Sequence, residues 1–270
     1  MRSQNLTFSD RWMFNRVMCE EDVCRRVLRA ILGFDIGRIE YLNAEQAIEL
    51  AAASRGVRMD VFAREGGKVY DIEMQVEREP SLGRRMRYYQ AVIDAGELEP
   101  GCGFNMLPES FVVFVCCYDP YGAGAPVYRI ERTCLERPRV EIGDDSHWLA
   151  LNAHAWEAET RSDLRDMLHY VQTGKADGAL SRDIDSLVLT YNQDREWVNR
   201  VLTYEQDTEI RCQRARAEGI EQGIEQGIEQ GEARLLALAQ RLSAAGRLDD
   251  LLRAADDSAY RDALFEEFEL

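Results

Sequence analysis

The sequence has no apolar run that approaches the about 20 residues needed for a membrane-spanning helix. Its first ten residues, MRSQNLTFSD, also lack the apolar segment of a signal peptide. We therefore expect a cytoplasmic protein without membrane contact. With 46% hydrophobic residues, the 270-residue chain can still bury a sizeable core.

The sequence also lacks cysteine and histidine motifs with the spacing typical of disulfide frameworks or metal sites. The seven cysteines include no CxxC pair, and their odd number argues against a disulfide framework. We expect reduced thiols, with adjacent Cys116 and Cys117 on a strand, one buried and one facing outward. The histidines His147, His154 and His169 show no metal-site spacing, so we interpret them as packing or surface residues.

Positive charge is scarce, because 33 Lys and Arg face 49 Asp and Glu, which gives a formal net charge of −16. Nucleic-acid binding normally draws on clustered basic residues. One such cluster exists in residues 78–89, where four arginines accompany one glutamate: Arg78, Arg84, Arg85 and Arg87. Much of the acidic excess lies elsewhere, in residues 141–163 and after Glu218. A local basic surface is therefore compatible with the acidic total.

Residues 57–76 contain two strand-forming runs that flank Gly66-Gly67, a pattern typical of a two-residue hairpin turn. Counting back from the turn places Glu65 opposite Lys68. One face then carries the apolar pairs Ala63/Tyr70, Val61/Ile72 and Met59/Met74. The other face carries the pairs Phe62/Asp71, Asp60/Glu73 and Arg58/Gln75.

In this register the carboxylates of Asp60 and Glu73 lie side by side, since directly opposed residues have Cβ atoms roughly 4.5–5.5 Å apart. Their repulsion would be offset by a divalent cation, by a shared proton, or by Arg58 folded over the pair. Ligands that are all oxygen favour magnesium or manganese over zinc. The alternative is a solvated sheet face, with both carboxylates in water beside Arg58 and Arg64.

The rest of the first half predicts a helix, strand, hairpin, helix, strand order. Residues 10–32 predict an amphipathic helix, broken near Glu20 and ended by Gly33. Residues 39–50 begin as a strand and continue as strand or loop, and residues 81–98 predict a helix. The run SFVVFVCCYD, residues 110–119, predicts a strand buried on both faces of a mixed or partly parallel sheet.

After a further strand in PVYRIERTC, the second half is predicted to be helical. Helices are expected in residues 162–173, 181–192 and 196–218, the first capped by Ser162. The repeat GIEQGIEQGIEQG, residues 219–231, is interpreted either as a linker or as a helix that packs on a copy of itself, because each glycine costs a helix roughly 1 kcal/mol. Beyond it, an apolar stripe of Leu235, Leu238 and Leu242 requires a partner.

Several motifs together resemble one family. FNRVM, GVRMDV, YDIEMQ, RRMRYYQAVID and FVVFVCCYDPYGAGAPVY, between about Leu6 and Asn152, are similar to the recombination-promoting nuclease and putative transposase family of the PD-(D/E)XK nuclease superfamily. Glycine-punctuated charged repeats near the C-terminus are also familiar in that family. The resemblance implies an α/β fold with an αβββαβ core, a mixed sheet flanked by helices, and here a helical C-terminal extension.

The resemblance also implies a site. Asp60 and Glu73 would hold Mg²⁺, or Mn²⁺, with the Met74 carbonyl as a further ligand. Gln75 stands where most of the superfamily has lysine and would orient the attacking water by hydrogen bonding. The proline that usually precedes the aspartate is replaced by Met59. Some relatives add an acidic residue from the first helix, for which Glu20 is our candidate.

These observations predict a nuclease core in residues 1–152, a helical extension in 153–218, the repeat in 219–231 and a C-terminal helical segment in 232–270 that forms a homo-oligomer. The predicted function is metal-dependent hydrolysis of DNA, associated with recombination or mobile elements. Arg84, Arg85 and Arg87 are expected to contact phosphates. The alternative is a non-catalytic nucleic-acid-binding or assembly protein that keeps the fold.

Overall fold

The computed structural model describes residues 5–48 and 57–270. The chain divides into two compact units, Met1–Val201 and Leu202–Leu270. Each unit is described by itself. The sheet and the candidate site lie in the first unit, and the second consists mainly of most of a long helix and two short helices.

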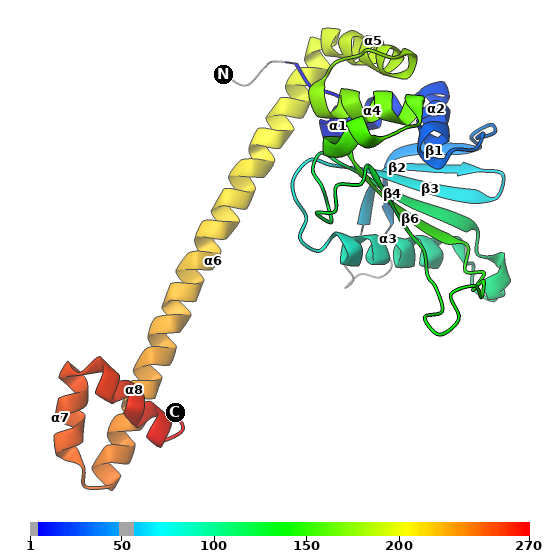
Figure 1. The fold of residues 1–270 in the computed structure, drawn as a ribbon. Helices are drawn as coiled ribbons and strands as arrows, with labels where there is room; N and C mark the ends of the chain where they lie inside the picture. Colours follow the sequence, from blue (N-terminus) through cyan, green and yellow to red (C-terminus); the bar gives the residue numbers. More distant parts are fainter. Residues whose placement is uncertain (1–4, 49–56) are drawn as a thin grey trace. The chain divides into compact units, whose positions relative to one another are not determined.

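A six-stranded mixed sheet forms the centre of the first unit, in the order β1-β2-β3-β4-β6-β5 (Figure 1). Its strands are β1 Tyr41–Ile48, β2 Val57–Glu65, β3 Lys68–Gln75, β4 Glu109–Cys116, β5 Val127–Ile130 and β6 Ser146–Asn152. β4 is parallel to both β3 and β6, whereas the other neighbours are antiparallel. The sequence predicted this buried, partly parallel strand correctly.

The hairpin of β2 and β3 has the register that the sequence predicts. Its ladder runs over five pairs, from Glu65 with Lys68 to Val61 with Ile72. Gly66 and Gly67 have φ values of 56° and 77°, which L side chains rarely adopt, so the turn depends on glycine. Both faces of the hairpin are covered, since most residues of β2 and β3 are buried.

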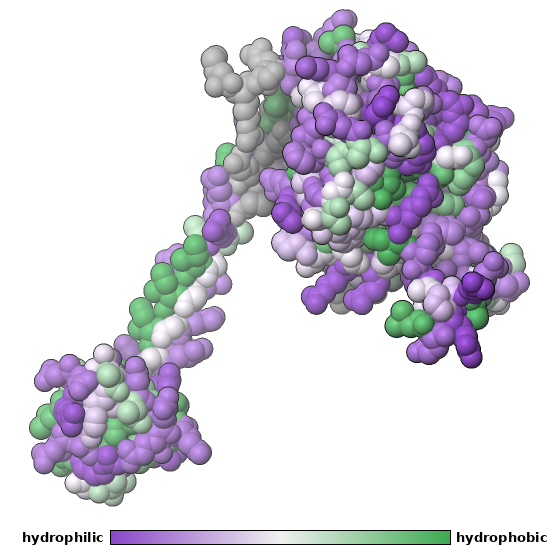
Figure 2. All heavy atoms as spheres, viewed as in Figure 1, coloured by the Kyte–Doolittle hydropathy of each residue, from purple (hydrophilic) through white to green (hydrophobic). Residues whose placement is uncertain are grey.

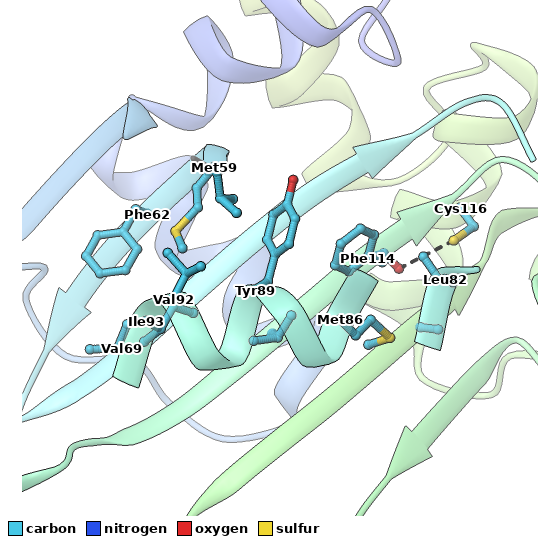
Figure 3. Packing of buried hydrophobic residues seen from close by; sticks show 13 residues of the cluster. Met59, Phe62, Val69, Leu82, Met86, Tyr89, Val92, Ile93, Phe114 and Cys116 are labelled. Carbon is cyan, nitrogen blue, oxygen red and sulfur yellow. Dashed lines mark hydrogen bonds between the residues drawn. The ribbon is translucent and has the colours of Figure 1, made fainter. Parts of the chain in front are cut away.

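Helices cover both faces of the sheet. On one face lie α1 Arg11–Met18, α2 Glu21–Leu32, α4 Ser162–Thr173 and α5 Ala179–Gln193, and on the other lies α3 Leu82–Glu97 (Figure 1). Under α3, an apolar cluster joins the helix to β2, β3 and β4 (Figure 3). Met59 belongs to this cluster together with Phe62, so the prediction that Met59 shares the opposite face with Val61 is wrong.

The predicted helix boundaries in the first half are confirmed. Residues 10–32 form two helices, with the break at Cys19-Glu20, and Gly33 ends the second with a φ of 85°. β6 was missed by the sequence analysis, because SHWLALN is short and follows a strongly acidic loop. Ser162 begins α4 as expected but forms no side-chain cap.

Two of the helices expected after residue 153, α4 and α5, are part of the first unit, whereas most of the third lies in the second unit as part of a longer helix. α4 packs on α2, and α5 packs on α1 and α2. The structure therefore divides the chain later than the sequence suggested, between Val201 and Leu202.

The repeat in residues 219–231 is helical and belongs to α6, which runs without interruption over Arg195–Ala244. Glutamate and glutamine are strong helix formers and outweigh the glycines here. The helical conformation is therefore observed, whereas packing of this helix on a second copy stays a prediction.

The second unit has a small core of its own. α7 Leu248–Asp256 and α8 Ser258–Glu267 pack against the end of α6 around Leu238, Leu242, Ala254 and Leu264. Leu238 and Leu242 are therefore buried within one chain, while Leu235 remains 46% exposed. For Leu238 and Leu242 the partner that the sequence requires is therefore supplied by α7 and α8 of the same chain. In the described residues, no helix combines the length and apolar character that a membrane crossing requires.

Candidate functional site

The two predicted carboxylates meet where β2 and β3 stop pairing. Beyond Val61 and Ile72, the Asp60 N–H donates to Glu73 Oε1 at 2.7 Å. The Met74 N–H donates to Asp60 Oδ2 at 3.1 Å. Each carboxylate thus accepts the backbone N–H that a carbonyl of the opposite strand would otherwise accept. These two hydrogen bonds hold both side chains between β2 and β3, just beyond the last paired residues.

This site is buried, so the alternative of a solvated sheet face is wrong. Asp60 is 4% exposed, Glu73 1% and Asp71 0%. α3 covers the face on which Glu73 lies, as its Arg85 and Tyr89 reach this carboxylate region. Buried carboxylates keep their charge only when partners compensate for the lost water.

Two arginines supply part of that compensation. Arg11 of α1 places Nε 2.8 Å from Asp60 Oδ1. Arg85 of α3 places Nη2 3.0 Å from Glu73 Oε2. The sequence had considered Arg58 for this role, but the Arg58 guanidinium lies over the Trp12 ring, 5.7 Å from its centroid.

Arg85 also organises its neighbours. Its Nη1 donates to Gln75 Oε1 at 2.5 Å, and its Nη2 donates to the Tyr89 hydroxyl at 2.9 Å. Gln75 donates in turn from Nε2 to the Glu77 carbonyl at 2.7 Å. The Tyr89 ring packs against Phe114 in a T-shaped contact with centroids 5.5 Å apart (Figure 3). Arg85 is thus a bridge within the site, where the sequence had predicted a phosphate contact.

Burial controls the protonation of the carboxyl groups. It raises the pKa of Glu73 to about 8, with the charge of Asp60 acting in the same direction and Arg85 against it. Burial also raises the pKa of Asp60, while Arg11 lowers it. The pKa of Asp71 is well above its usual range because of burial and then the charges of Glu73 and Asp60. Such shifts are typical of functional sites.

Three residues of this constellation were missed from the sequence. Arg11 gives no local signal, since it comes from a helix far from the hairpin in the chain. Asp71 could have been found, because the predicted register puts it on the same strand face as Glu73. Within the described residues, neither carboxyl oxygen of Asp71 has a hydrogen-bond partner of acceptable geometry. Tyr89 could have been found from its i,i+4 spacing to Arg85.

A basic hollow of about 570 Å³ opens next to the carboxylates. Three arginines and two tyrosines dominate its described lining. The full set of lining residues is Val57, Arg58, Glu79, Ser81, Arg84, Arg85, Tyr88 and Tyr89. Arg84 therefore lies where the sequence placed it, beside the site. Arg87 is exposed on α3 but does not line this hollow.

The other predicted ligands occupy different positions. Glu20 is exposed at the start of α2 and accepts a hydrogen bond from Tyr191 of α5, so the structure gives no support for its joining the site. Met74 contacts the site through its N–H, which donates to Asp60. Among residues 5–48 and 57–270, no three His, Cys, Asp or Glu side chains are arranged to hold a metal ion between them.

The fold and the site together define an α/β protein whose mixed sheet holds a buried carboxylate pair, each carboxylate ion-paired with its own arginine, beside a basic hollow. No protein-family model, curated protein or solved structure matches the chain. What the protein does is therefore inferred from the site itself.

Proposed function

We propose that the protein is a metal-dependent nuclease of the PD-(D/E)XK type that hydrolyses phosphodiester bonds in DNA during recombination or transposition. The observation that carries the proposal is the buried pair of Asp60 and Glu73, which lies where the β2–β3 pairing ends, next to the basic hollow. The resemblance of the surrounding motifs to the recombination-promoting nuclease and putative transposase family supports it.

The donor set suits magnesium or manganese. Mg²⁺ in phosphate-processing sites is held by one or two carboxylates, with waters and substrate phosphate completing the shell. Asp60 and Glu73 would be these carboxylates, which requires Arg11 and Arg85 to release them. Both arginines are able to turn, since their side chains are 43% and 32% exposed. A bound divalent cation lowers the pKa of a coordinated water and stabilises charge on the phosphate.

The protein groups supply orientation and positive charge. Gln75 is neutral, so its amide accepts a hydrogen bond from the attacking water, and Arg85 sets the direction of that amide. In the reaction the water oxygen bonds to phosphorus and gives up one proton to solvent, the bond from phosphorus to the leaving sugar oxygen breaks, and that oxygen takes up a proton from solvent. Arg84, which lines the hollow, and Arg87, which is exposed on the same helix, would meet phosphates of the bound strand.

The test is nicking of supercoiled plasmid by the full-length protein. Cleavage is expected with Mg²⁺ and lost in EDTA, and it is expected to be lost in Asp60→Ala and Glu73→Ala, which should fold. Asp35→Ala is the matched control, because the Asp35 side chain is 94% exposed and its nearest ion-pair contact, Arg29, is at 4.0 Å. Wild-type nicking by both site variants would refute the assignment.

A second candidate function follows from the arginine contacts. If Arg11 and Arg85 stay on Asp60 and Glu73 when nucleic acid binds, the fold serves as a non-catalytic binding or assembly protein. This alternative predicts that DNA binds equally well with EDTA or Mg²⁺ and that no cleavage follows with any divalent ion. Parallel assays with an RNA of the same sequence distinguish the two nucleic acids.

A further inference from the structure

A second hollow, of about 560 Å³, lies at the β5 edge of the sheet. Its walls are largely aromatic and aliphatic, with Tyr121, Tyr128 and Trp148 as the ring side chains and Arg129 as the charged one. Tyr128 and Trp148 also pack against the apolar cluster under α3, which holds them in place.

The polar ends of these side chains are already engaged. The Tyr128 hydroxyl donates to Asp119 Oδ1 at 2.7 Å, and Trp148 Nε1 donates to Gln90 Oε1 at 3.3 Å. The Tyr121 hydroxyl approaches Met86 Sδ at 3.7 Å, while 43% of Tyr121 remains exposed. The Tyr121 and Tyr128 rings form a T-shaped pair with centroids 5.0 Å apart. What this hollow offers to a ligand is therefore ring surface rather than hydrogen-bonding groups.

The aromatic hollow adjoins the basic one. Gly83, in the first turn of α3, lines the aromatic hollow, whereas Ser81, Arg84 and Arg85 of the same region line the basic hollow. The two hollows thus lie on two sides of one helical turn, and a helix with its side chains is about 10–12 Å across. A short stretch of one nucleic-acid strand covers that distance.

We propose that the aromatic hollow is a stacking site for an unpaired nucleobase of the strand whose phosphates occupy the basic hollow. Every base has a π face, so stacking on tyrosine and tryptophan is tolerant of sequence. In a duplex that face is covered by neighbouring bases and has to be unstacked first. The preferred substrate is therefore single-stranded or locally opened nucleic acid. This inference rests on the proposed nuclease function and specifies its substrate.

The experiment measures binding of full-length protein in EDTA, where cleavage is absent. The probes are a fluorescently labelled single-stranded DNA oligonucleotide, the same sequence as a duplex, and a single strand with one 2-aminopurine. The wild type is expected to prefer the single strand and to quench the 2-aminopurine. Tyr121→Ala is expected to weaken single-strand binding roughly 5- to 100-fold and to relieve the quenching, since it removes a stacking ring. Tyr121→Phe keeps the ring and is expected to retain both signals.

A second variant blocks the hollow without touching its rings. Apart from its chain neighbours and the backbone of its own helix, no heavy atom lies within 4 Å of a Cβ built on Gly83, so Gly83→Leu fits the helix and fills the adjoining space. It is expected to reproduce the Tyr121→Ala loss, whereas Ala91→Leu, on an exposed position of α3 outside both hollows, is expected to bind like wild type.

The outcomes separate this inference from the function. Unchanged single-strand binding and quenching in Tyr121→Ala and Gly83→Leu would overturn the stacking site and leave the nuclease proposal standing. A change of molecular mass in light scattering, without a change in DNA binding, would make the hollow an interface between copies and also overturn the inference. If neither strand form binds, the inference fails, and the plasmid assay decides the nuclease question independently.

Discussion

Glu73 combines burial, a neighbouring carboxylate and an arginine partner in one side chain. It is 1% exposed, accepts the Asp60 N–H and is bonded by Arg85. Burial and Asp60 favour the protonated form, and the pKa near 8 shows that they outweigh Arg85. Because the negative charge of Glu73 is unfavourable here, a cation that binds beside it would stabilise the ionised site. This stabilisation is the physical reason to expect metal dependence.

The first prediction concerns stability against pH in EDTA. The pKa of Glu73 is about 8 in the folded protein, against an ordinary value of 4.5. Between these values the folded state holds a proton that the unfolded state has released, so stability should fall as pH rises from about 4.5 to about 8. Glu73→Gln should remove this part of the slope and be more stable than the wild type at pH 8. Urea midpoints at several pH values check this, with exposed Glu99→Gln as control; an unchanged slope would contradict the burial argument.

The second prediction separates Arg85 from Arg87. Arg85 orients the Gln75 amide, so Arg85→Met should lower kcat more than it raises KM. Arg87 is exposed and touches neither carboxylate, so Arg87→Ala should raise KM and reduce the salt dependence of DNA binding. Steady-state cleavage at several salt concentrations measures both. The same KM effect for both variants would mean that Arg85 meets the phosphates after all.

Among the elements, the β2–β3 hairpin decides where the site is, because its register brings Asp60 and Glu73 together. The register depends on a turn in which both glycines have positive φ. No neighbouring heavy atom lies within 4 Å of a Cβ built on either glycine. Glycine is therefore required at these positions for its backbone conformation and not because a side chain would clash. α3 then closes the face of the hairpin and brings Arg85 onto Glu73.

The third prediction tests the turn. Gly67→Ala should destabilise the first unit by about 1–2 kcal/mol, the usual cost of placing an L residue in the left-handed region. Gly83→Ala in α3 is the matched control with equal open space, and it should be neutral or stabilising by up to roughly 1 kcal/mol. Chemical denaturation of both variants gives the comparison, and equal effects would show that the turn does not define the register.

For the whole molecule, the division into two units means that each has its own core. The second unit relies on a small cluster around Leu242, which is 0% exposed. Leu242→Ala should therefore cost about 2–5 kcal/mol locally and loosen α7 and α8 without affecting the sheet. Hydrogen exchange should show lost protection in Leu248–Glu267 only. Leu236→Ala, at a 62% exposed position on α6, is the control and should have little effect.

Self-association also belongs to this scale and stays a prediction. With Leu238 and Leu242 buried within the chain, the exposed apolar side chains on the repeat are Ile220, Ile224 and Ile228, at 56%, 60% and 57% exposure. Figure 2 shows an apolar stripe, in green, along the long helix, with residues of intermediate hydropathy, in white, beside it. Replacing all three by glutamine should reduce the mass in light scattering if copies pair through the repeat. An unchanged mass would contradict self-association through the repeat.

The sequence by itself determined the features that depend on near neighbours in the chain. The hairpin register follows from a period of two and a Gly-Gly turn, the helix break follows from the interruption at Cys19-Glu20, and the buried strand follows from the run in 110–119. These patterns specify backbone conformation, and they were enough to bring Asp60 opposite Glu73.

Only the tertiary structure decided what covers each surface. That α3 buries the carboxylates, that Arg11 rather than Arg58 compensates Asp60, and that Leu242 is covered by α8 all depend on segments distant in the sequence. β6 joined the sheet because β4 offered it a parallel partner. Burial and ion pairing are set by which elements pack together, and periodicity within one element does not contain that information.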